Sequence, residues 1–271
     1  MRVLPQPGDL VGPYRLTRFL GAGAMGTVHE AEDAVLGRPV ALKVIAGEVA
    51  SDPAFRDRFV REARAMASVD SPHVVQVFAH GEADGRLWTA TQLVPDGDLG
   101  ALLRREGPLP PEVALELVAQ VADGVAETHR VGLVHRDVKP ANVLLRRRGT
   151  HLVAHLADFG LAAAPGRGER FAGTPGYRAP EVEAGGQATA ASDVYSLGCL
   201  LRALLPAGAV RGEVELLLAT ALAVDPAARH PSAAALRHAL RALLAAPVRR
   251  RRRMLSGLVS ARPAATRGRS R

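Results

Sequence analysis

The apolar residues of this 271-residue chain change their spacing near Pro95. Before Pro95 they alternate with polar residues or fall in short runs, which is typical of strands. After it they recur every three to four residues, which is typical of helices. The strand-type segments are YRLTRFL (14–20), TVHEA (27–31), PVALKVI (39–45), VVQVF (74–78) and LWTATQLV (87–94). The pattern predicts a small β-rich lobe followed by a larger helical lobe, an α+β fold with a seam near Pro95.

One helix is expected within the first lobe. Ser51, Asp52 and Pro53 form a good helix start, since proline suits the first turn. The residues that follow place an apolar side chain every three to four positions, at Phe55, Phe59, Ala63 and Met66.

The second lobe is expected to be mainly helical. Pro110 and Pro111 open a helix that ends near His129, and three later helices centre on 193–205, 213–223 and 232–245. The apolar content of 48% suffices for a core, which must rely on Leu, Val and Ala because aromatic residues make up only 4%.

The net charge of +8 comes from the end of the chain. Residues 248–271 carry nine arginines and no acidic residue, which leaves about −1 for residues 1–247. The body is therefore not a basic nucleic-acid-binding domain. We expect 248–271 to be an arginine-rich disordered tail. The tail is either simply solvated or attracted to an anionic membrane or another polyanion.

The remaining bulk features favour a cytoplasmic protein. The single cysteine, Cys199, lies in an apolar run and reads as a small buried hydrophobe of a reducing compartment. The first twelve residues lack the apolar centre of a signal peptide, and no stretch is long and apolar enough for a transmembrane segment.

A glycine-rich turn, GAGAMGTV (21–28), stands between the first two predicted strands. Dinucleotide-binding folds use similar glycines, but between a strand and a helix. Between two strands, such glycines let backbone N–H groups approach phosphate oxygens without a Cβ in the way. Alone the motif is weak, because an ordinary flexible hairpin gives the same pattern.

The chain contains 33 arginines and only two lysines, Lys43 and Lys139. Lys43 lies in the third predicted strand, and Glu62 follows on the predicted helix. A buried ammonium beside phosphates needs an anionic partner. The two would otherwise read as an unrelated surface pair, but the preceding glycine turn favours a phosphate site.

The stretch LVHRDVKPANVLL (133–145) places Asp137, Lys139 and Asn142 on one short loop. DFG (158–160) and RAPE (178–181) follow in order. Phosphoryl transfer needs a base for the incoming hydroxyl, oxygen ligands for magnesium and cations on the phosphates, and these motifs together supply all three.

With these motifs, the chain resembles the eukaryotic-like serine/threonine protein kinases of bacteria from about Tyr14 to Leu244. The resemblance implies a two-lobed fold with an antiparallel sheet and one helix in the N-lobe. The expected divisions are an N-terminal extension (1–12), N-lobe (13–94), C-lobe (95–247) and tail (248–271). Between the helices near 193–205 and 213–223 the C-lobe is shorter than in relatives.

The resemblance also implies the cofactors ATP and Mg²⁺, for which Mn²⁺ could substitute. Asp137 would accept or orient the substrate hydroxyl proton and Lys139 would neutralise the γ-phosphoryl group. Lys43 would contact the α- and β-phosphates and pair with Glu62, Asn142 and Asp158 would hold the metal, and Thr174 would bond Asp137 and Lys139. The nucleotide site would comprise Leu20, Gly21, Gly23, Gly26, Val28, Ala41, Lys43, Thr91, Gln92, Val94 and Leu144, with Thr91 as gatekeeper and Gln92–Val94 as hinge.

Three further contacts are expected near this site. Asp193 would brace the catalytic loop through its backbone, and Glu181 would pair with Arg229. The loop between DFG and APE has Thr174 and Tyr177 as its only hydroxyl residues, so we expect Glu169 to serve as a fixed partner for Arg136 in place of a phosphate.

A lysine is a compact charge on a thin stem, whereas an arginine is a broad planar fork. Lys43 and Lys139 therefore stand where the chemistry leaves no room for a guanidinium.

The lysine at 139 and the segment GTPGYRAPE favour protein Ser/Thr substrates, with autophosphorylation as one outcome and no specific nucleic acid partner. Two alternatives stay open. One is a regulatory pseudokinase or scaffold, against which the complete set of catalytic residues argues. The other is a kinase of small molecules, suggested by the shortened C-lobe.

Overall fold

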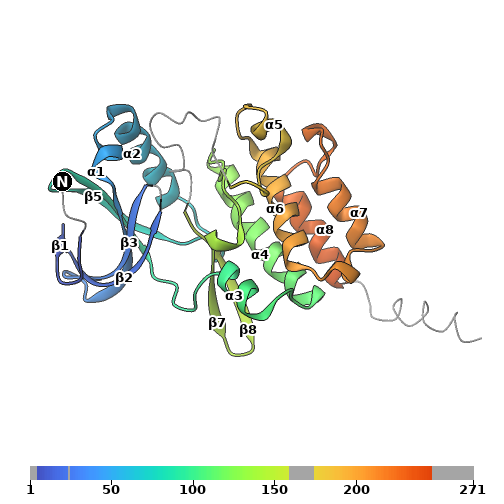
Figure 1. Ribbon diagram of the computed structural model, residues 1–271, viewed down its shortest axis with the longest axis horizontal. Coiled ribbons are helices and arrows are strands. Elements are labelled where there is room, and N and C mark those ends of the chain that lie inside the picture. The colour runs from blue at the N-terminus through green and yellow to red at the C-terminus, as the bar shows by residue number, and fades with distance from the viewer. Residues whose placement is uncertain (1–4, 24, 159–173, 246–271) are drawn as a thin grey trace, which may run out of the picture.

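Six strands form one antiparallel sheet in the N-lobe (Figure 1). The computed structural model describes residues 5–23, 25–158 and 174–245. In spatial order the strands are β1 (Leu10–Val11), β2 (Tyr14–Gly23), β3 (Gly26–Asp33), β4 (Arg38–Ile45), β6 (Arg86–Gln92) and β5 (Val77–Ala83). Alternation separates the two faces of β4: Val40, Leu42 and Val44 enter an apolar cluster with Trp88, and Lys43 faces the opposite side.

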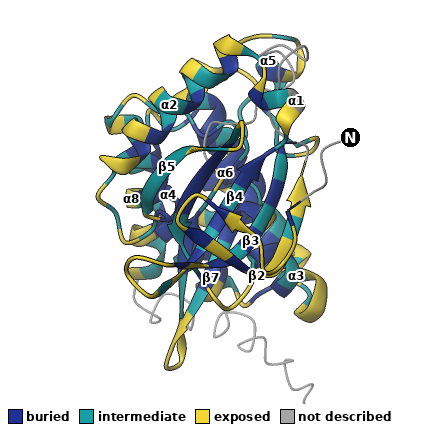
Figure 2. Ribbon diagram, turned by 90° about the vertical axis from the view of Figure 1, so that its left-hand side faces the viewer, coloured by how far each residue is buried: buried dark blue, intermediate teal, exposed yellow. Residues whose placement is uncertain are grey.

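Helix α2 (Pro53–Ala67) packs beside the sheet, preceded by the short α1 (Gly47–Ala50). Asp52 caps α2 by accepting the N–H of Ala54 at 2.9 Å, and Pro53 is the first helical residue, as predicted. The predicted stripe is buried while the outer side of the helix is exposed (Figure 2). Phe55 and Phe59 are fully covered and anchor α2 beside β4 and β6.

The strand predicted over 74–78 is confirmed only at its last two residues, because β5 spans Val77–Ala83. Val74 and Val75 are buried as their apolar character requires, but they pair with the end of β8 (His151–Leu156) instead of joining the sheet. The N–H of Val75 donates to Leu156 O at 2.9 Å, and the N–H of Leu156 donates to His73 O at 2.8 Å. This crossing ties the two lobes together.

The second lobe is mainly helical, as predicted. Its α-helices are α3 (Leu99–Glu106), α4 (Pro111–Arg130), α5 (Pro180–Glu183), α6 (Ala190–Leu204), α7 (Glu213–Ala221) and α8 (Ala233–Ala245). They surround one apolar core whose central members include Val118, Val121, Val125, Leu197, Leu201 and Leu240. Between α6 and α7 the chain forms only a short 3₁₀ turn, Ala207–Ala209, so the C-lobe is short at this point.

A two-stranded ribbon, which the sequence reasoning missed, lies beneath the seam between the lobes. It pairs β7 (Val143–Arg148) with β8 (His151–Leu156) in antiparallel register, with Leu144 opposite His155. The linker from β6 to α3 is bonded to this ribbon, since the N–H of Leu145 donates to Gly97 O at 2.8 Å. The ribbon therefore holds the linker in position.

Candidate active site

One buried carboxylate of α6 holds the catalytic loop, residues 133–142. Asp193 accepts the backbone N–H of His135 at 2.7 Å on Oδ2 and that of Arg136 at 2.9 Å on Oδ1. His129, at the end of α4, donates its Nε2–H to the same Oδ2 at 2.8 Å. Arg136 has a φ of 72°, a left-handed conformation that is uncommon outside glycine and that these bonds support. The predicted bracing role of Asp193 is confirmed.

His135 fixes the same loop from its other side. Its Nδ1 accepts the N–H of Asp137 at 3.2 Å, and its Nε2–H donates to Ala157 O at 3.0 Å, so the ring is neutral. Burial lowers the pKa of His135, and this effect outweighs Asp193 and the other nearby acids, which would raise it. A neutral histidine thus locks the position of Asp137.

The side chains of the catalytic loop converge on Asp137. Thr174 donates its hydroxyl to Asp137 Oδ1 at 2.8 Å and accepts from Lys139 Nζ at 2.6 Å. Lys139 Nζ also lies 2.7 Å from Asp137 Oδ2. Asn142 donates its Nδ2–H to the backbone oxygen of Asp137 at 2.8 Å and to Oδ2 at 3.1 Å. The predicted contacts of Thr174 are confirmed.

Lys43 of β4 pairs with Asp158, which follows β8 in the chain. Its Nζ donates to Asp158 Oδ1 at 2.6 Å. Desolvation would raise the pKa of Asp158, but Lys43, with His135 and Lys139, holds that pKa below its usual value. Asp158 has a φ of 59°, so the backbone turns sharply at this residue and directs its carboxylate toward Lys43.

The expected pair between Lys43 and Glu62 is not the pair that forms. Glu62 instead lies 3.5 Å from Arg136 Nη1, with both side chains largely buried. The observed pairs are therefore Lys43 with Asp158 and Arg136 with Glu62, whereas the sequence predicted Lys43 with Glu62. Glu169, the predicted partner of Arg136, lies outside the described residues, so that prediction remains untested.

The glycine-rich segment forms the end of the β2–β3 hairpin, between two strands as predicted. Gly26 has a φ of 147°, and a Cβ at this position would lie 2.0 Å from the backbone oxygen of Val44. Only glycine fits there. Gly21 and Gly23 have open space where a Cβ would stand, which leaves their backbone approachable.

The predicted nucleotide residues gather on the face of the sheet that carries Lys43. Val28 lies opposite Lys43 and Ala41 lies opposite Thr91, so their side chains share a face. Thr91 donates its hydroxyl to Ala41 O at 3.3 Å.

The other nucleotide residues lie around that face. Val94 is buried in the linker, Leu144 is half-buried on the ribbon below, and Leu20 is exposed at the hairpin. Gln92 lies opposite Val40, which belongs to the apolar cluster, so the side chain of Gln92 points away from Lys43 and only its backbone can serve the nucleotide. The individual roles of these residues remain predictions.

The predicted pair between Glu181 and Arg229 is confirmed. Arg229 donates two parallel bonds to the carboxylate, at 2.7 and 2.6 Å, and its side chain is fully buried. Further donations go to the backbone oxygens of Ala191, Ala223 and Val224. Arg229 therefore links α5, which carries Glu181, to the first turn of α6, which carries Ala191.

Two structural residues were missed by sequence reasoning. His129 shares the Asp193 carboxylate, and its place at the end of α4, shortly before His135, was the available signal. Arg146 donates to the linker oxygen of Leu93 at 3.1 Å. No pattern indicated this bond, because Arg146 stands in a run of three arginines with nothing to distinguish it.

The family assignment follows from comparison with known proteins. The protein kinase domain model matches residues 14–238, so this chain belongs to the protein kinase family. The chain is 43% identical to serine/threonine-protein kinase PknE of Mycobacterium tuberculosis over 200 residues, 72% of this chain and 35% of that protein. It is 40% identical to PknH of the same species over 204 residues, 73% of this chain and 32% of PknH. The chain thus spans about a third of the length of these relatives.

Solved structures show the same fold. The kinase domain of Mycobacterium tuberculosis PknI aligns with a TM-score of 0.73 and 32% identity, covering 88% of this chain and 99% of that domain. A double mutant of that domain aligns with a TM-score of 0.74 and 30% identity. The predicted two-lobed kinase fold is confirmed. In residues 5–23, 25–158 and 174–245, none of the helices has both the length and the hydrophobicity that a bilayer span requires.

Proposed function

We propose that this chain is a serine/threonine protein kinase that transfers the γ-phosphoryl group of ATP to hydroxyl groups of proteins. The observation that carries the proposal is the environment of Asp137. Its carboxylate is oriented by Thr174 and Asn142, lies beside the ammonium of Lys139, and stands on a loop whose backbone α6 holds. A base held in this way is preorganised for a hydroxyl group that arrives in the cleft.

In the proposed reaction the hydroxyl oxygen of the substrate bonds the γ-phosphorus while the bond from that phosphorus to the β–γ bridging oxygen breaks. The hydroxyl proton goes to Asp137, and ADP leaves with the electron pair of the broken bond. Lys139, 2.7 Å from the Asp137 carboxylate, is placed to neutralise charge on the transferred group. The backbone at Gly21 and Gly23 is open toward the phosphates.

Asn142 and Asp158 fit a magnesium ion, which prefers hard oxygen ligands and binds proteins through few of them together with phosphate oxygens. Asp158 supplies a carboxylate. Asn142 turns its amide nitrogen to Asp137, which leaves its amide oxygen for a cation. When bound, the metal would neutralise charge on the phosphates. Mn²⁺ has the same preference for oxygen and could substitute.

We infer that the observed ion pairs represent a resting arrangement. Catalysis in this family requires the strand lysine to pair with the helix glutamate while the DFG aspartate binds metal. Here Lys43 pairs with Asp158, and Glu62 pairs with Arg136. Both pairs must exchange before the site is complete. Glu169 would favour that exchange by taking over Arg136.

The proposal extends to substrates and location. A lysine at 139 bonded to Thr174 supports protein Ser/Thr substrates, and the short connection between α6 and α7 offers them a reduced docking surface. We propose a cytoplasmic site of action, where ATP is available and the buried Cys199 stays reduced. The only contribution proposed for the arginine-rich tail, residues 248–271, is added affinity for anionic surfaces.

The test is incubation with labelled ATP, Mg²⁺ and a generic basic protein, beside the matched variant Asp137→Asn. Label on protein Ser or Thr that depends on Asp137 supports the proposal. Binding of ATP without transfer would instead indicate a pseudokinase, and label found only on small metabolites would indicate a small-molecule kinase.

A further inference from the structure

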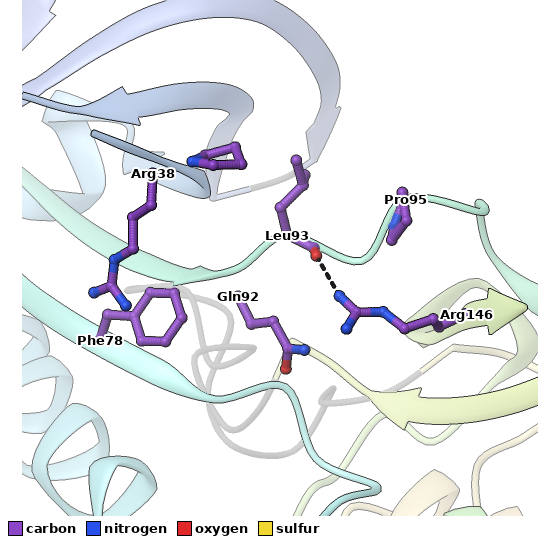
Figure 3. A pocket seen from close by; sticks show the side chains of 7 residues that line it. Arg38, Phe78, Gln92, Leu93, Pro95 and Arg146 are labelled. Carbon is purple, nitrogen blue, oxygen red and sulfur yellow. Dashed lines mark hydrogen bonds between the residues drawn. The ribbon is translucent and has the colours of Figure 1, made fainter. Parts of the chain in front are cut away.

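A pocket of about 360 Å³ lies at the junction of the sheet, the linker and the β7–β8 ribbon (Figure 3). We call it the linker pocket. Its lining residues are Arg38 and Pro39 of β4, Phe78 of β5, Gln92 of β6, Leu93 and Pro95 of the linker, and Arg146 of β7.

The linker pocket is distinct from the proposed nucleotide site. Along β6, Trp88 and Ala90 belong to the apolar cluster on one face of the sheet, and Gln92 shares their alternation. Thr89 and Thr91 point to the opposite face, where Thr89 lies across from Lys43. Phe78 also packs against the apolar cluster. Arg38, Phe78 and Gln92 therefore line the linker pocket from the face of the sheet opposite to Lys43.

The charged side chains that line this pocket are both cationic. The seven lining residues include two arginines and no acid. Arg38 stacks on the Phe78 ring with its guanidinium carbon 3.7 Å from the ring centre. Its Nε is buried and, within the described part of the chain, lacks a hydrogen-bond acceptor. The nearest carboxylate oxygen, Asp33 Oδ2, is 3.7 Å away, while Asp33 Oδ1 accepts from two backbone N–H groups.

Arg146 lies on the other side of the pocket and donates one hydrogen bond to the linker. Its Nη2 donates to Leu93 O at 3.1 Å (Figure 3). A guanidinium carries five N–H donors in a planar fork, so this bond leaves others for a ligand. The nearby linker carboxylates are engaged elsewhere: Asp96 accepts the backbone N–H of Arg147 at 2.7 Å, and Asp98 that of Ala101 at 2.8 Å.

The pKa of a buried histidine on the same ribbon indicates how its surroundings affect charged groups. His155 lies opposite Leu144 and shares the face of the ribbon from which Arg146 projects. Burial lowers the pKa of His155 to about 4, with further lowering by Arg146, His73 and Arg148. The surroundings are so positive and so poorly hydrated that this ring stays neutral. The smaller part of this lowering, which comes from the charges of Arg146 and Arg148, is the part that would also attract an anion held beside Arg146.

We propose that the linker pocket binds a small organic anion with a flat apolar body, whose carboxylate bonds the guanidinium groups of Arg38 and Arg146. The body would lie between Pro39 and Pro95, beside the Arg38 guanidinium that covers the Phe78 ring, and the Gln92 amide would add a polar contact. Arginine suits this task because its planar fork matches a carboxylate in two parallel bonds. A neutral ligand of the same shape would form no charge-assisted bond with either guanidinium group.

The same geometry couples the linker pocket to the nucleotide site, a consequence that rests on the proposed function. Arg146 holds the carbonyl of Leu93, and Leu93 lies in the proposed hinge. An anion that draws Arg146 into the pocket would weaken this bond. By linkage, any change that the anion makes in nucleotide affinity must appear equally in anion affinity when nucleotide is bound.

The experiment uses 2-naphthoate as the probe and neutral 2-naphthamide as its matched control. Binding is measured by calorimetry and located by the NMR shifts of Leu93 and Arg146, with a non-hydrolysable ATP analogue saturating the nucleotide site. We expect a Kd for naphthoate of about 1 mM or below, and a naphthamide affinity at least about tenfold weaker. Arg38→Gln and Arg146→Gln should each weaken naphthoate about tenfold or more, since each removes a charge-assisted bond.

Arg147→Gln is the matched control variant, since Arg147 is exposed on the same strand and is not part of the pocket. Its naphthoate affinity should equal that of the wild type within twofold. Three results would overturn the proposal: no binding up to about 10 mM, equal affinity for naphthamide, or an equal loss in Arg147→Gln. Full competition, in which the apparent Kd for naphthoate rises in proportion to the concentration of the ATP analogue without reaching a limit, would likewise reject it by assigning the probe to the nucleotide site. Binding requires no phosphoryl transfer, so this test stands even if the chain proves inactive as a kinase.

Discussion

Replacing Asp193 by asparagine should both destabilise the protein and disable its catalytic loop. The two oxygens of the carboxylate accept three hydrogen bonds. The donors are the His135 N–H at 2.7 Å, the His129 ring at 2.8 Å and the Arg136 N–H at 2.9 Å. An asparagine keeps the shape but turns an NH₂ group toward one of those donors, so at least one donor loses its acceptor. The residue is fully buried. A lost charge-assisted bond together with an opposed buried donor predicts a loss of about 3 kcal/mol in the free energy of unfolding.

The assay is urea unfolding of Asp193→Asn beside Asp123→Asn. Asp123 pairs with Arg237 between α4 and α8, where both side chains are partly exposed, so its loss should cost less than about 1 kcal/mol. In the folded fraction, Asp193→Asn should lower kcat by about a hundredfold or more while ATP affinity changes little, because the loop and not the nucleotide site is disturbed. Equal unfolding midpoints for the two variants would refute this reasoning.

Three further predictions concern the charged groups of the site and the ribbon. Lys43→Arg should lose nearly as much phosphoryl transfer as Lys43→Met, since a planar fork does not replace a compact charge; near-normal turnover with arginine would argue against the assignment. In protein whose loop between DFG and APE is unmodified, as verified by mass spectrometry, the wild type should be active. Glu169→Gln should be clearly slower, because Arg136 would then stay paired with Glu62. An inactive wild type or an equally active variant would reject this prediction. Because the folded pKa of His155, about 4, lies below its unfolded value, stability should fall as the pH drops from about 6.5 toward 4, by up to about 3 kcal/mol. A His155→Gln variant measured by urea unfolding should show a flatter profile over that window, and an unchanged profile would contradict the burial argument.

The contacts that the sequence predicted correctly are those whose two partners both lie in highly specific motifs. Thr174 bonds Asp137, Asp193 braces the loop, and Arg229 pairs with Glu181. In each case one arrangement satisfies buried polar groups that would otherwise be costly, so the motif leaves little choice.

The partner of Lys43 could not be predicted in the same way. Glu62 and Asp158 can each serve as the anionic partner of a lysine, and a difference of about a few kcal/mol between two conformations is enough to decide which pair forms. A residue pattern identifies the groups that can pair but not which of two closely balanced states a given structure adopts. The pairing of Glu62 with Arg136 is the visible result.

Short apolar runs caused the errors in secondary structure. Val74 and Val75 are as buried as strand residues, yet they form a single bridge to Leu156, and the sequence offers no signal for that distant partner. The β7–β8 ribbon was missed because three successive arginines hide its alternation. Its turn at Gly149, with a φ of 60°, was the available sign. The linker pocket combines segments far apart in sequence and could be found only in the folded chain.

The central claim is that Asp137 performs the chemical step of a phosphoryl transfer. The most direct measurement is single-turnover transfer from pre-bound ATP to a protein serine, in wild type and in Asp137→Asn. The account predicts a rate at least about a thousandfold lower in the variant, with ATP affinity unchanged within a few-fold, because only the base and its orienting contacts are altered. A variant rate within tenfold of wild type, or no transfer by the wild-type protein, would contradict it.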